Sequence, residues 1–184
     1  ANLLLTKENI VQNLIIYSTT DGQTLAICKR ISEIISKDQD TKIVSLNEAN
    51  DINISLYSKI IIGASIRYGK HKPELYKFIK RNHSELVAKN TSFFSVNVVA
   101  RKPEKNTPET NPYMQKFLSL SDWKPEHLGV FAGKIDYPKY KFIDKHMIRL
   151  IMWITKGPTN LDGTYEFTNW DSVNNFANKI GSKN

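Results

Sequence analysis

A short polar segment of the chain has residue types that could bind an anion. It follows an apolar run, leads straight into a helical pattern, and has the sequence Ser18-Thr19-Thr20-Asp21-Gly22-Gln23-Thr24. Small hydroxyl residues and a glycine allow several backbone N–H groups to converge on one anion, and a helix N-terminus adds the positive end of its dipole. The segment contains no Lys or Arg, so hydrogen bonds would hold the ligand, which suits a buried phosphate monoester. Ordinary helix N-caps use the same residue types, so the pattern by itself leaves both interpretations open.

We call residues 18–24 the anion loop. Other signatures of nucleotide or nucleophile chemistry do not occur in the sequence, which has neither a G-x-x-x-x-G-K-[ST] nor a G-x-G-x-x-G motif. The single cysteine, Cys28, falls on the apolar face of the following helical pattern and is expected to be a buried, inert thiol. His71 and His83 stand alone in a loop or at a helix end and are expected at the surface. We expect no metal site.

Alternating strands and helices are needed to position the anion loop. Continuous apolar runs predict strands over residues 13–17, 42–45, 59–64, 92–98 and 128–133. Helical periodicity predicts helices over residues 24–37, from Pro73 onward, around Met114 to Leu118, and from Trp170 to Ile180 with Asn169 as its N-cap. This alternation predicts an α/β fold with an open, doubly wound parallel sheet and helices on both faces. Ligands of such sheets bind beyond the carboxyl ends of the strands, so the loops there form the candidate site.

Length and composition are those of one globular domain. The chain has 184 residues, of which 40% are hydrophobic and 24% charged, which excludes a disordered or fibrous protein. Residues 1–11 are interpreted as an N-terminal extension and residues 12–184 as the domain. The longest strongly apolar stretch, Met147 to Ile154, contains Arg149 and is too short to span a membrane.

Positive charge is concentrated in one part of the chain. The net charge is +8, and residues 65–157 carry 18 Lys and Arg against 8 Asp and Glu. A cationic region of this kind predicts an anionic partner, while a solvated Lys-rich surface is the alternative. We expect no nucleic-acid partner, because the sequence has neither aromatic strand platforms nor a recognition-helix pattern.

Two further loops combine with the anion loop into a family resemblance. They have the sequences Gly63-Ala64-Ser65-Ile66-Arg67-Tyr68-Gly69 and Ser95-Val96-Asn97-Val98-Val99-Ala100-Arg101-Lys102-Pro103-Glu104-Lys105. Together the three loops resemble the menaquinone-dependent protoporphyrinogen IX dehydrogenases of the flavodoxin superfamily, and the likeness runs from about residue 13 to residue 180. The stretches 100–105 and 139–154 are more specific to these enzymes than the anion loop, which flavodoxin-like proteins share.

This resemblance implies a flavodoxin-like sheet of order 2-1-3-4-5 and one bound FMN. The FMN phosphate would lie on the anion loop, and the isoalloxazine ring between the loops 65–69 and 95–101. Tyr68 is the candidate for stacking on the ring, with an ordinary surface tyrosine as the alternative. The implied cofactor-binding residues are Ser18, Thr19, Thr20, Asp21, Gly22, Gln23, Thr24, Ser65, Ile66, Arg67, Tyr68, Gly69, Ser95, Val96, Asn97, Val98, Val99, Ala100 and Arg101.

A long segment before the last helix is the second distinctive feature. The resemblance implies that residues 138–163 form a basic insert that interrupts strand five, and that residues 164–167 resume this strand. Residues 142–155 can form a helix with an apolar face that contains Ile143, Met147, Leu150, Ile151 and Ile154. A narrow basic stripe contains Lys141, Lys145 and Arg149, and the aromatic residues Tyr140, Phe142 and Trp153 flank it. Such a helix suits a membrane interface or a quinone site, and packing on the sheet or on a second subunit is the alternative. We expect residues 139–156 to contact an anionic membrane surface.

The resemblance implies an FMN-dependent oxidoreductase of haem biosynthesis. It would convert protoporphyrinogen IX to protoporphyrin IX and pass the electrons to a membrane quinone, menaquinone or ubiquinone, at the inner face of the cell membrane on the cytoplasmic side. Arg67, Arg101 and Lys102 are the candidate partners of the substrate propionates, although Arg101 and Lys102 could equally be solvated loop charges. The alternatives are a flavodoxin-like electron carrier and an FMN-dependent quinone reductase. A second copy of the chain, in a homo-oligomer, is a further candidate partner, since the apolar face of the helix at residues 142–155 could pack on a second subunit.

Overall fold

The core of the protein is one parallel β-sheet. The computed structural model describes residues 12–19, 22–37 and 39–181, so the proposed N-terminal extension lies outside the described residues. Five strands pair in the order β2-β1-β3-β4-β5, and every pair is parallel. Their bounds are β1 Asn13–Ser18, β2 Thr41–Ser45, β3 Lys59–Ser65, β4 Asn90–Val96 and β5 His127–Phe131. The predicted doubly wound sheet and its strand order are confirmed.

The strands are apolar on both faces because helices cover both faces. Along β1, Leu14 and Ile16 join one hydrophobic core and Ile15 joins the other. Successive side chains of a strand point to opposite faces, so a strand buried on both sides has a continuous apolar run. At β3, Gly63 lies against the ring of Phe94 on β4, and an added Cβ would lie 2.0 Å from the Cζ of that ring.

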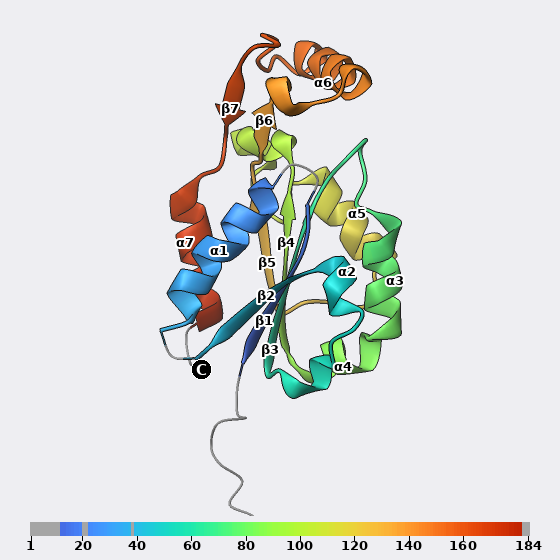
Figure 1. Cartoon of the computed structure of the whole chain (residues 1–184), viewed down its shortest axis with the longest axis vertical. Coiled ribbons are helices and arrows are strands. Elements are labelled where there is room, and N and C mark those ends of the chain that lie inside the picture. Colours follow the sequence, from blue (N-terminus) through green and yellow to red (C-terminus); the bar gives the residue numbers. More distant parts are fainter. Residues whose placement is uncertain (1–11, 20–21, 38, 182–184) are drawn as a thin grey trace, which may run out of the picture.

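Helices α1 (Gln23–Ile35) and α7 (Trp170–Gly181) pack side by side on one face of the sheet (Figure 1). The other face is covered by α2 (Leu46–Ala49), α3 (Pro73–Arg81), α4 (His83–Ala88) and α5 (Pro112–Leu120). The predicted helices are present, and α3 and α4 together contain the residues expected of one helix after Pro73. The Asn169 cap is confirmed, because its Oδ1 accepts a hydrogen bond of 3.2 Å from the backbone N–H of Ser172.

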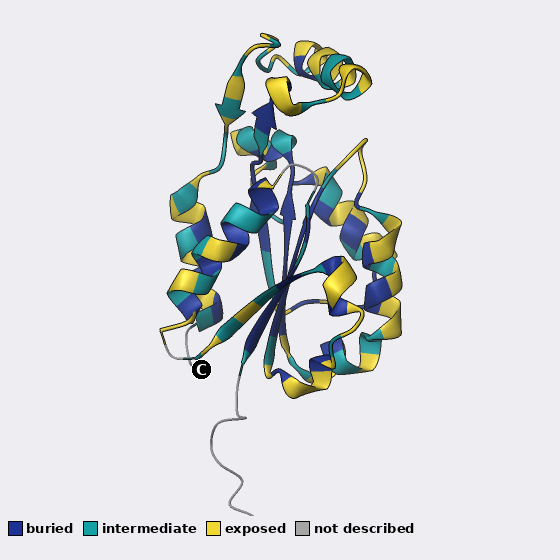
Figure 2. Cartoon of the chain, in the orientation of Figure 1, coloured by how far each residue is buried: buried dark blue, intermediate teal, exposed yellow. Residues whose placement is uncertain are grey.

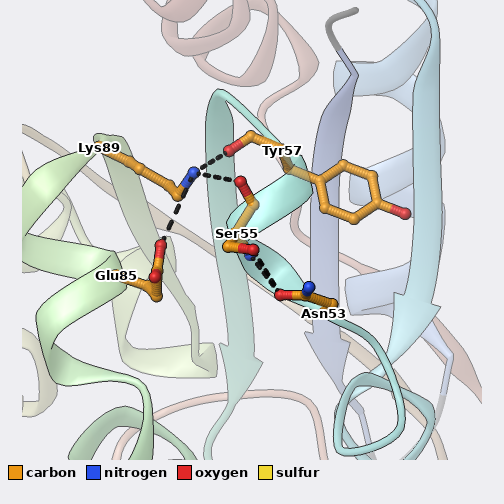
Figure 3. Close-up of polar contacts among 5 residues, drawn as sticks. All are labelled: Asn53, Ser55, Tyr57, Glu85 and Lys89. Atoms are coloured by element: carbon orange, nitrogen blue, oxygen red, sulfur yellow. Dashed lines mark hydrogen bonds and ion pairs between the residues drawn. The ribbon is translucent and has the colours of Figure 1, made fainter. Parts of the chain in front are cut away.

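A lysine connects the segments that precede β3 and β4 at the amino ends of these strands. The ammonium group of Lys89 donates to the carbonyl oxygens of Ser55 and Tyr57, at 3.0 and 2.6 Å, and pairs with Glu85 at 3.8 Å (Figure 3). Asn53 accepts from the backbone N–H of Ser55 and caps the short helix η2 (Ile54–Leu56) that precedes β3. These contacts fix the entry into β3 at the end of the sheet that is remote from the candidate site.

The insert follows β5 and does not interrupt it. After β5 the chain forms β6 (Lys134–Asp136), the turn η5 (Tyr137–Lys139), helix α6 (Phe142–Ile154) and β7 (Thr164–Glu166). Strand β7 pairs antiparallel with β6 in a separate two-stranded ribbon, so the expectation that residues 164–167 resume strand five is wrong. The ribbon reverses direction because the chain must return from α6 to α7, and it places α6 over the carboxyl ends of the strands (Figure 1).

Most apolar side chains of α6 are exposed (Figure 2). Met152 is the one buried residue of the helix, at 4% exposure, and it packs with Ile135 and Tyr137 in a small core beneath the insert. Exposed fractions reach 76% for Phe142 and 72% for Trp153. The predicted helix is confirmed, and packing of its whole apolar face on the sheet is excluded.

Candidate functional site

The loops at the carboxyl ends of β3 and β4 and the insert enclose a cavity of about 620 Å³. One wall comes from Ile66, Arg67, Tyr68 and Gly69 after β3, and a second from Asn97, Val98, Val99 and Arg101 after β4. Helix α6 and the ribbon close the opposite side with Lys134, Ile135, Lys139, Tyr140, Lys141, Asp144, Met147, Ile148, Ile151, Met152 and Thr155. The loops that the sequence indicated therefore meet at one place, and Tyr113 of α5 joins them.

The anion loop has the features of an anion site. Gly22 precedes α1 with φ at 91°, a left-handed conformation that favours glycine, and its N–H donates to the Thr19 hydroxyl at 2.9 Å. The hydroxyl of Thr24 in the first turn of α1 is fully buried and has no hydrogen-bond partner among the described residues. A buried, unpaired hydroxyl costs free energy unless a ligand satisfies it. This orphaned group at a helix N-terminus fits a bound phosphate, while Thr20 and Asp21 lie outside the described residues.

Two side-chain contacts connect the anion loop to distant parts of the chain. The amide of Gln23 donates to Glu166 and Thr168 at 2.9 Å each, so its side chain ties the loop to the segment before α7. Lys72, just before α3, donates to the carbonyl oxygen of Thr19 at 3.5 Å. The loop itself contains no cation, but the fold brings one to it. No local pattern in the sequence could indicate this, since the two residues are 53 positions apart.

Tyr68 is displayed at the tip of a tight turn. Arg67 and Lys70 exchange both backbone hydrogen bonds, and Tyr68 and Gly69 between them have φ angles of 51° and 76°. Two consecutive left-handed residues define a type I′ turn, and a tyrosine in this conformation is strained by about 1 kcal/mol. The ring is half-exposed, lines the cavity, and has the Arg67 guanidinium 5.1 Å from its centroid. Backbone strain of this kind is frequent at ligand-binding sites, so Tyr68 remains the candidate for a ligand contact.

The loop after β4 is held from behind by buried polar groups. The expectation that His71 lies at the surface is wrong, because it is only 3% exposed and its Nε2 lies 2.9 Å from the hydroxyl of Ser95. Burial, followed by the nearby positive charge of Lys116, lowers the pKa of His71 to about 4. The imidazole is therefore neutral at physiological pH. His83 is half-buried at the start of α4, away from the cavity.

The three cationic candidates have different surroundings. The guanidinium of Arg101 donates to the carbonyl oxygen of Val98 at 3.1 Å and to the carbonyl and hydroxyl oxygens of Thr155 at 3.0 and 3.1 Å, and burial lowers its pKa. Arg67 pairs with Asp144 of α6 at 2.6 Å, and both residues line the cavity. Lys102 is not among the residues that line it.

The remaining implied residues lie behind the cavity. Ser65, Ser95 and Val96 are buried at the strand ends, Ala100 is buried in the short turn after β4, and none of the four lines the cavity. Cys28 is fully buried, and desolvation raises the pKa of its thiol far above the ordinary range, as expected of an inert cysteine. In the described part of the chain, no group of three metal-ligating side chains comes together. No helix within the described ranges has the length and hydropathy of a membrane span.

Comparisons with known proteins agree with this arrangement. Residues 14–162 match the family model of the flavodoxin domain. The chain is 41% identical over 171 residues to a protoporphyrinogen IX dehydrogenase (quinone) from Leishmania major, covering 92% of this chain and 74% of that protein. It is 39% identical to the enzyme of the same name from Escherichia coli strain K12, covering 92% and 94% of the two chains.

A solved structure shares the fold at low sequence identity. The two-electron reduced flavodoxin of Megasphaera elsdenii matches with a TM-score of 0.51 at 13% identity, over 64% of this chain and 84% of that one. The parallel sheet of order β2-β1-β3-β4-β5 is common to this fold. The chain thus belongs to the flavodoxin-domain family, in the group that contains these protoporphyrinogen IX dehydrogenases.

Proposed function

We propose that this protein is an FMN-dependent dehydrogenase that oxidises protoporphyrinogen IX and passes the electrons to a membrane quinone. The relatives with 39–41% identity over 92% of the chain carry the name protoporphyrinogen IX dehydrogenase (quinone). The observation that carries the proposal is the cavity of about 620 Å³ between the two loops and the insert, with an anion site beside it.

The residues at this site fit FMN. The buried hydroxyl of Thr24 and the N-terminus of α1 provide donors for a phosphate, and Lys72 provides a nearby positive charge. Tyr68 presents an aromatic face to the cavity, and the loop that begins at Asn97 forms the facing wall. When bound, FMN supplies the hydride-acceptor chemistry, which no side chain of the protein can supply.

The walls of the cavity suit a substrate that is largely apolar and carries carboxylates. Met147, Ile148 and Ile151 of α6 give it an apolar side, which would exclude water and hold a tetrapyrrole against the cofactor. Protoporphyrinogen IX loses hydrogen in repeated two-electron steps, and each step reduces one quinone to its quinol. The protein therefore has to position the substrate and orient its propionates.

We infer that Lys134, Lys139 and Lys141 bind these propionates. All three line the cavity. Lys134 and Lys141 form no ion pair among the described residues, and Lys139 pairs only with Asp136, at 3.4 Å. Arg101 is a less suitable partner, because its guanidinium already holds Val98 and Thr155. Ammonium groups at the rim of an apolar cavity would hold the two neighbouring propionates at one edge of the macrocycle without burying the charges.

Steady-state kinetics can test this assignment. We expect Lys134→Gln and Lys141→Gln to raise KM for protoporphyrinogen IX by about fivefold or more, since a hydrogen bond to a charged group contributes about 1.5–3 kcal/mol when buried and less at a rim. The dimethyl ester of the substrate has no carboxylate, so its KM should not change. Lys77→Gln on the exposed side of α3 is the matched control. An equal effect on the ester would contradict the assignment.

Helix α6 is the proposed membrane-contacting element. The exposed fractions of Phe142, Ile143, Trp153 and Ile154 lie between 66% and 76%. Residues 138–157 carry five Lys and Arg and one Asp, so the same surface is positively charged. An exposed apolar helix with basic residues suits the headgroup region of an anionic membrane, where each basic residue contributes about 1 kcal/mol. A membrane-contacting insert beside the cavity would also bring a lipid-soluble quinone to the site.

Vesicle sedimentation can distinguish binding through α6 from nonspecific binding of exposed apolar side chains to lipid. The triple variant Phe142→Ser, Trp153→Ser, Ile154→Ser should lose binding to vesicles of phosphatidylcholine and phosphatidylglycerol. The control variant Leu56→Ser, Val87→Ser, Leu120→Ser removes side chains that are 58–70% exposed elsewhere and should bind as the wild type does. Retention of binding by the α6 variant would refute the membrane assignment.

An anaerobic assay tests the activity itself. The protein loaded with FMN should convert protoporphyrinogen IX to fluorescent protoporphyrin IX when a menaquinone analogue is present, with one quinol formed for each two-electron step. A protein that binds FMN and accepts electrons from a reductase, but forms no porphyrin, would be an electron carrier instead.

A further inference from the structure

A chain of buried polar side chains lies directly behind the loop after β4. The Nε2 atom of His71 is 2.9 Å from the Ser95 hydroxyl, and the amide nitrogen of Asn97 donates to the same hydroxyl at 3.1 Å. Asn97 and Asn111 exchange two amide hydrogen bonds, of 3.2 and 2.9 Å. All four residues are at most 4% exposed. We call these four residues the His71 network.

Hydrogen-bond accounting assigns the direction of the first link. The Ser95 hydroxyl accepts from Asn97, and His71 is the partner to which it can donate. With the imidazole proton on Nδ1, the Nε2 atom accepts the hydroxyl proton of Ser95, whereas the other tautomer would leave this buried proton without an acceptor among the described residues. The ring also packs edge-on against Phe93 and Phe117, at centroid distances of 5.7 and 6.0 Å. Aromatic neighbours on two elements hold the imidazole in place.

The network ends on the backbone of the cavity wall. The side-chain oxygen of Asn97 accepts from the backbone N–H of Ala100 at 3.2 Å, which closes the short helix η3 (Val98–Arg101). Val98, Val99 and Arg101 of this turn line the cavity. Asn111 in turn caps α5 through the N–H groups of Tyr113 and Met114, at 3.1 Å each. The orientation of the Asn97 amide therefore sets the position of the wall.

We propose that His71 is a positioning residue for the flavin ring, acting through Ser95 and Asn97 on the turn Val98–Arg101. The proposal rests on the proposed function, because it takes this turn as the wall that contacts the isoalloxazine ring. His71 does not line the cavity, and the hydrogen bonds that connect it to the turn run through the side chains of Ser95 and Asn97. A turn held in one position would determine the affinity for the isoalloxazine ring and the shift of the flavin's midpoint potential from that of the free cofactor.

Flavin binding gives a readout that is independent of turnover. His71→Phe keeps the aromatic contacts with Phe93 and Phe117 but cannot accept a hydrogen bond. We expect it to weaken both FMN and riboflavin about tenfold, measured by quenching of flavin fluorescence, and to shift the midpoint potential of the bound flavin. Riboflavin lacks the phosphate, so an equal loss for both ligands locates the effect at the ring. His71→Gln, which restores an acceptor, should recover most of the affinity.

A double-mutant cycle separates positioning from general destabilisation. Ser95→Ala removes the central hydroxyl with the smallest change of volume and should weaken both ligands as His71→Phe does. The double variant should be no weaker than either single variant, because both break one connected network. His83→Phe lies outside the network and should bind within twofold of the wild type.

Two results would overturn the proposal, and they differ from each other. Wild-type binding of FMN together with unchanged affinity and potential in His71→Phe and Ser95→Ala would refute the positioning role alone. Failure of the wild-type chain to bind FMN or riboflavin at all would refute the proposed function and this inference with it.

Discussion

Replacement of Thr24 by Val should have opposite effects on the unliganded and the FMN-bound protein. The Thr24 side chain is fully buried and its hydroxyl has no partner among the described residues. Valine has nearly the same shape and a similar helix propensity, so the change removes the hydroxyl and little else. An unsatisfied buried hydroxyl costs about 1–3 kcal/mol, so the unliganded variant should be more stable by about 1–2 kcal/mol.

The same change should weaken FMN binding. A hydrogen bond to a charged phosphate contributes about 1.5–3 kcal/mol, which corresponds to a loss of affinity of about tenfold to a hundredfold. Riboflavin has no phosphate, so its affinity should stay within a factor of about two. The selective loss for FMN distinguishes a phosphate contact from a general distortion of the loop.

Two measurements decide this prediction. Thermal unfolding of the unliganded proteins should give a higher Tm for Thr24→Val, by about 2–4 °C for each kcal/mol in a chain of this size. Fluorescence titration gives the two flavin affinities. A less stable unliganded variant, or an equal loss of FMN and riboflavin affinity, would refute the assignment of Thr24 to the phosphate.

Three further changes test the fold and the site. Folding lowers the pKa of His71 from 6.5 to about 4, so the unfolded chain binds this proton first as the pH falls. Urea titrations should therefore show that this residue reduces the free energy of unfolding by about 2 kcal/mol between pH 7 and pH 5. The variant His71→Phe should lose that part of the pH dependence. Arg101→Gln should free the end of α6 from the loop after β4, because both bonds to Thr155 are lost, and hydrogen exchange at residues 152–157 should become faster while exchange in β1 is unchanged. Gly63→Ala should lower the free energy of unfolding measured in urea by about 1–3 kcal/mol, since its Cβ would overlap the ring of Phe94; stability equal to wild type would contradict this packing.

Periodic apolar patterns predicted the sheet and its helices because they record burial directly. Successive side chains of a strand point to opposite faces, so a strand with the run Ile60-Ile61-Ile62 needs helices on both faces of the sheet. All three residues are fully buried. The predicted bounds of the helices at 142–155 and 170–180 differ from the observed ones by one residue. These elements are determined by local sequence.

Contacts between distant segments were beyond prediction from local patterns. His71 was expected at the surface because nothing in its own loop indicates that Phe93, Ser95 and Phe117 enclose it. The pairing of β7 with β6 depends on the path of the insert, and the three-residue strands carry too little pattern to reveal it. The lysine next to the anion loop and the bond from Arg101 to Thr155 likewise join residues 53 and 54 positions apart.

The candidate site was predicted in outline by the resemblance and completed by the structure. The loops after β3 and β4 supply eight of the implied residues to the cavity wall. Insert residues such as Lys141 and Met147 form the other wall, and the sequence assigned this segment mainly to the membrane. An amphipathic pattern shows that a helix has an apolar face, but it does not show which side of the helix meets the protein and which meets its surroundings.

Rapid anaerobic mixing of the FMN-loaded protein with protoporphyrinogen IX, followed by a quinone, addresses the proposed reaction most directly. We predict that the yellow absorbance of the flavin is bleached within the turnover time as porphyrin forms, and that the quinone then restores it. Flavin that stays oxidised in the presence of protoporphyrinogen IX, although dithionite reduces it, would contradict the proposed function.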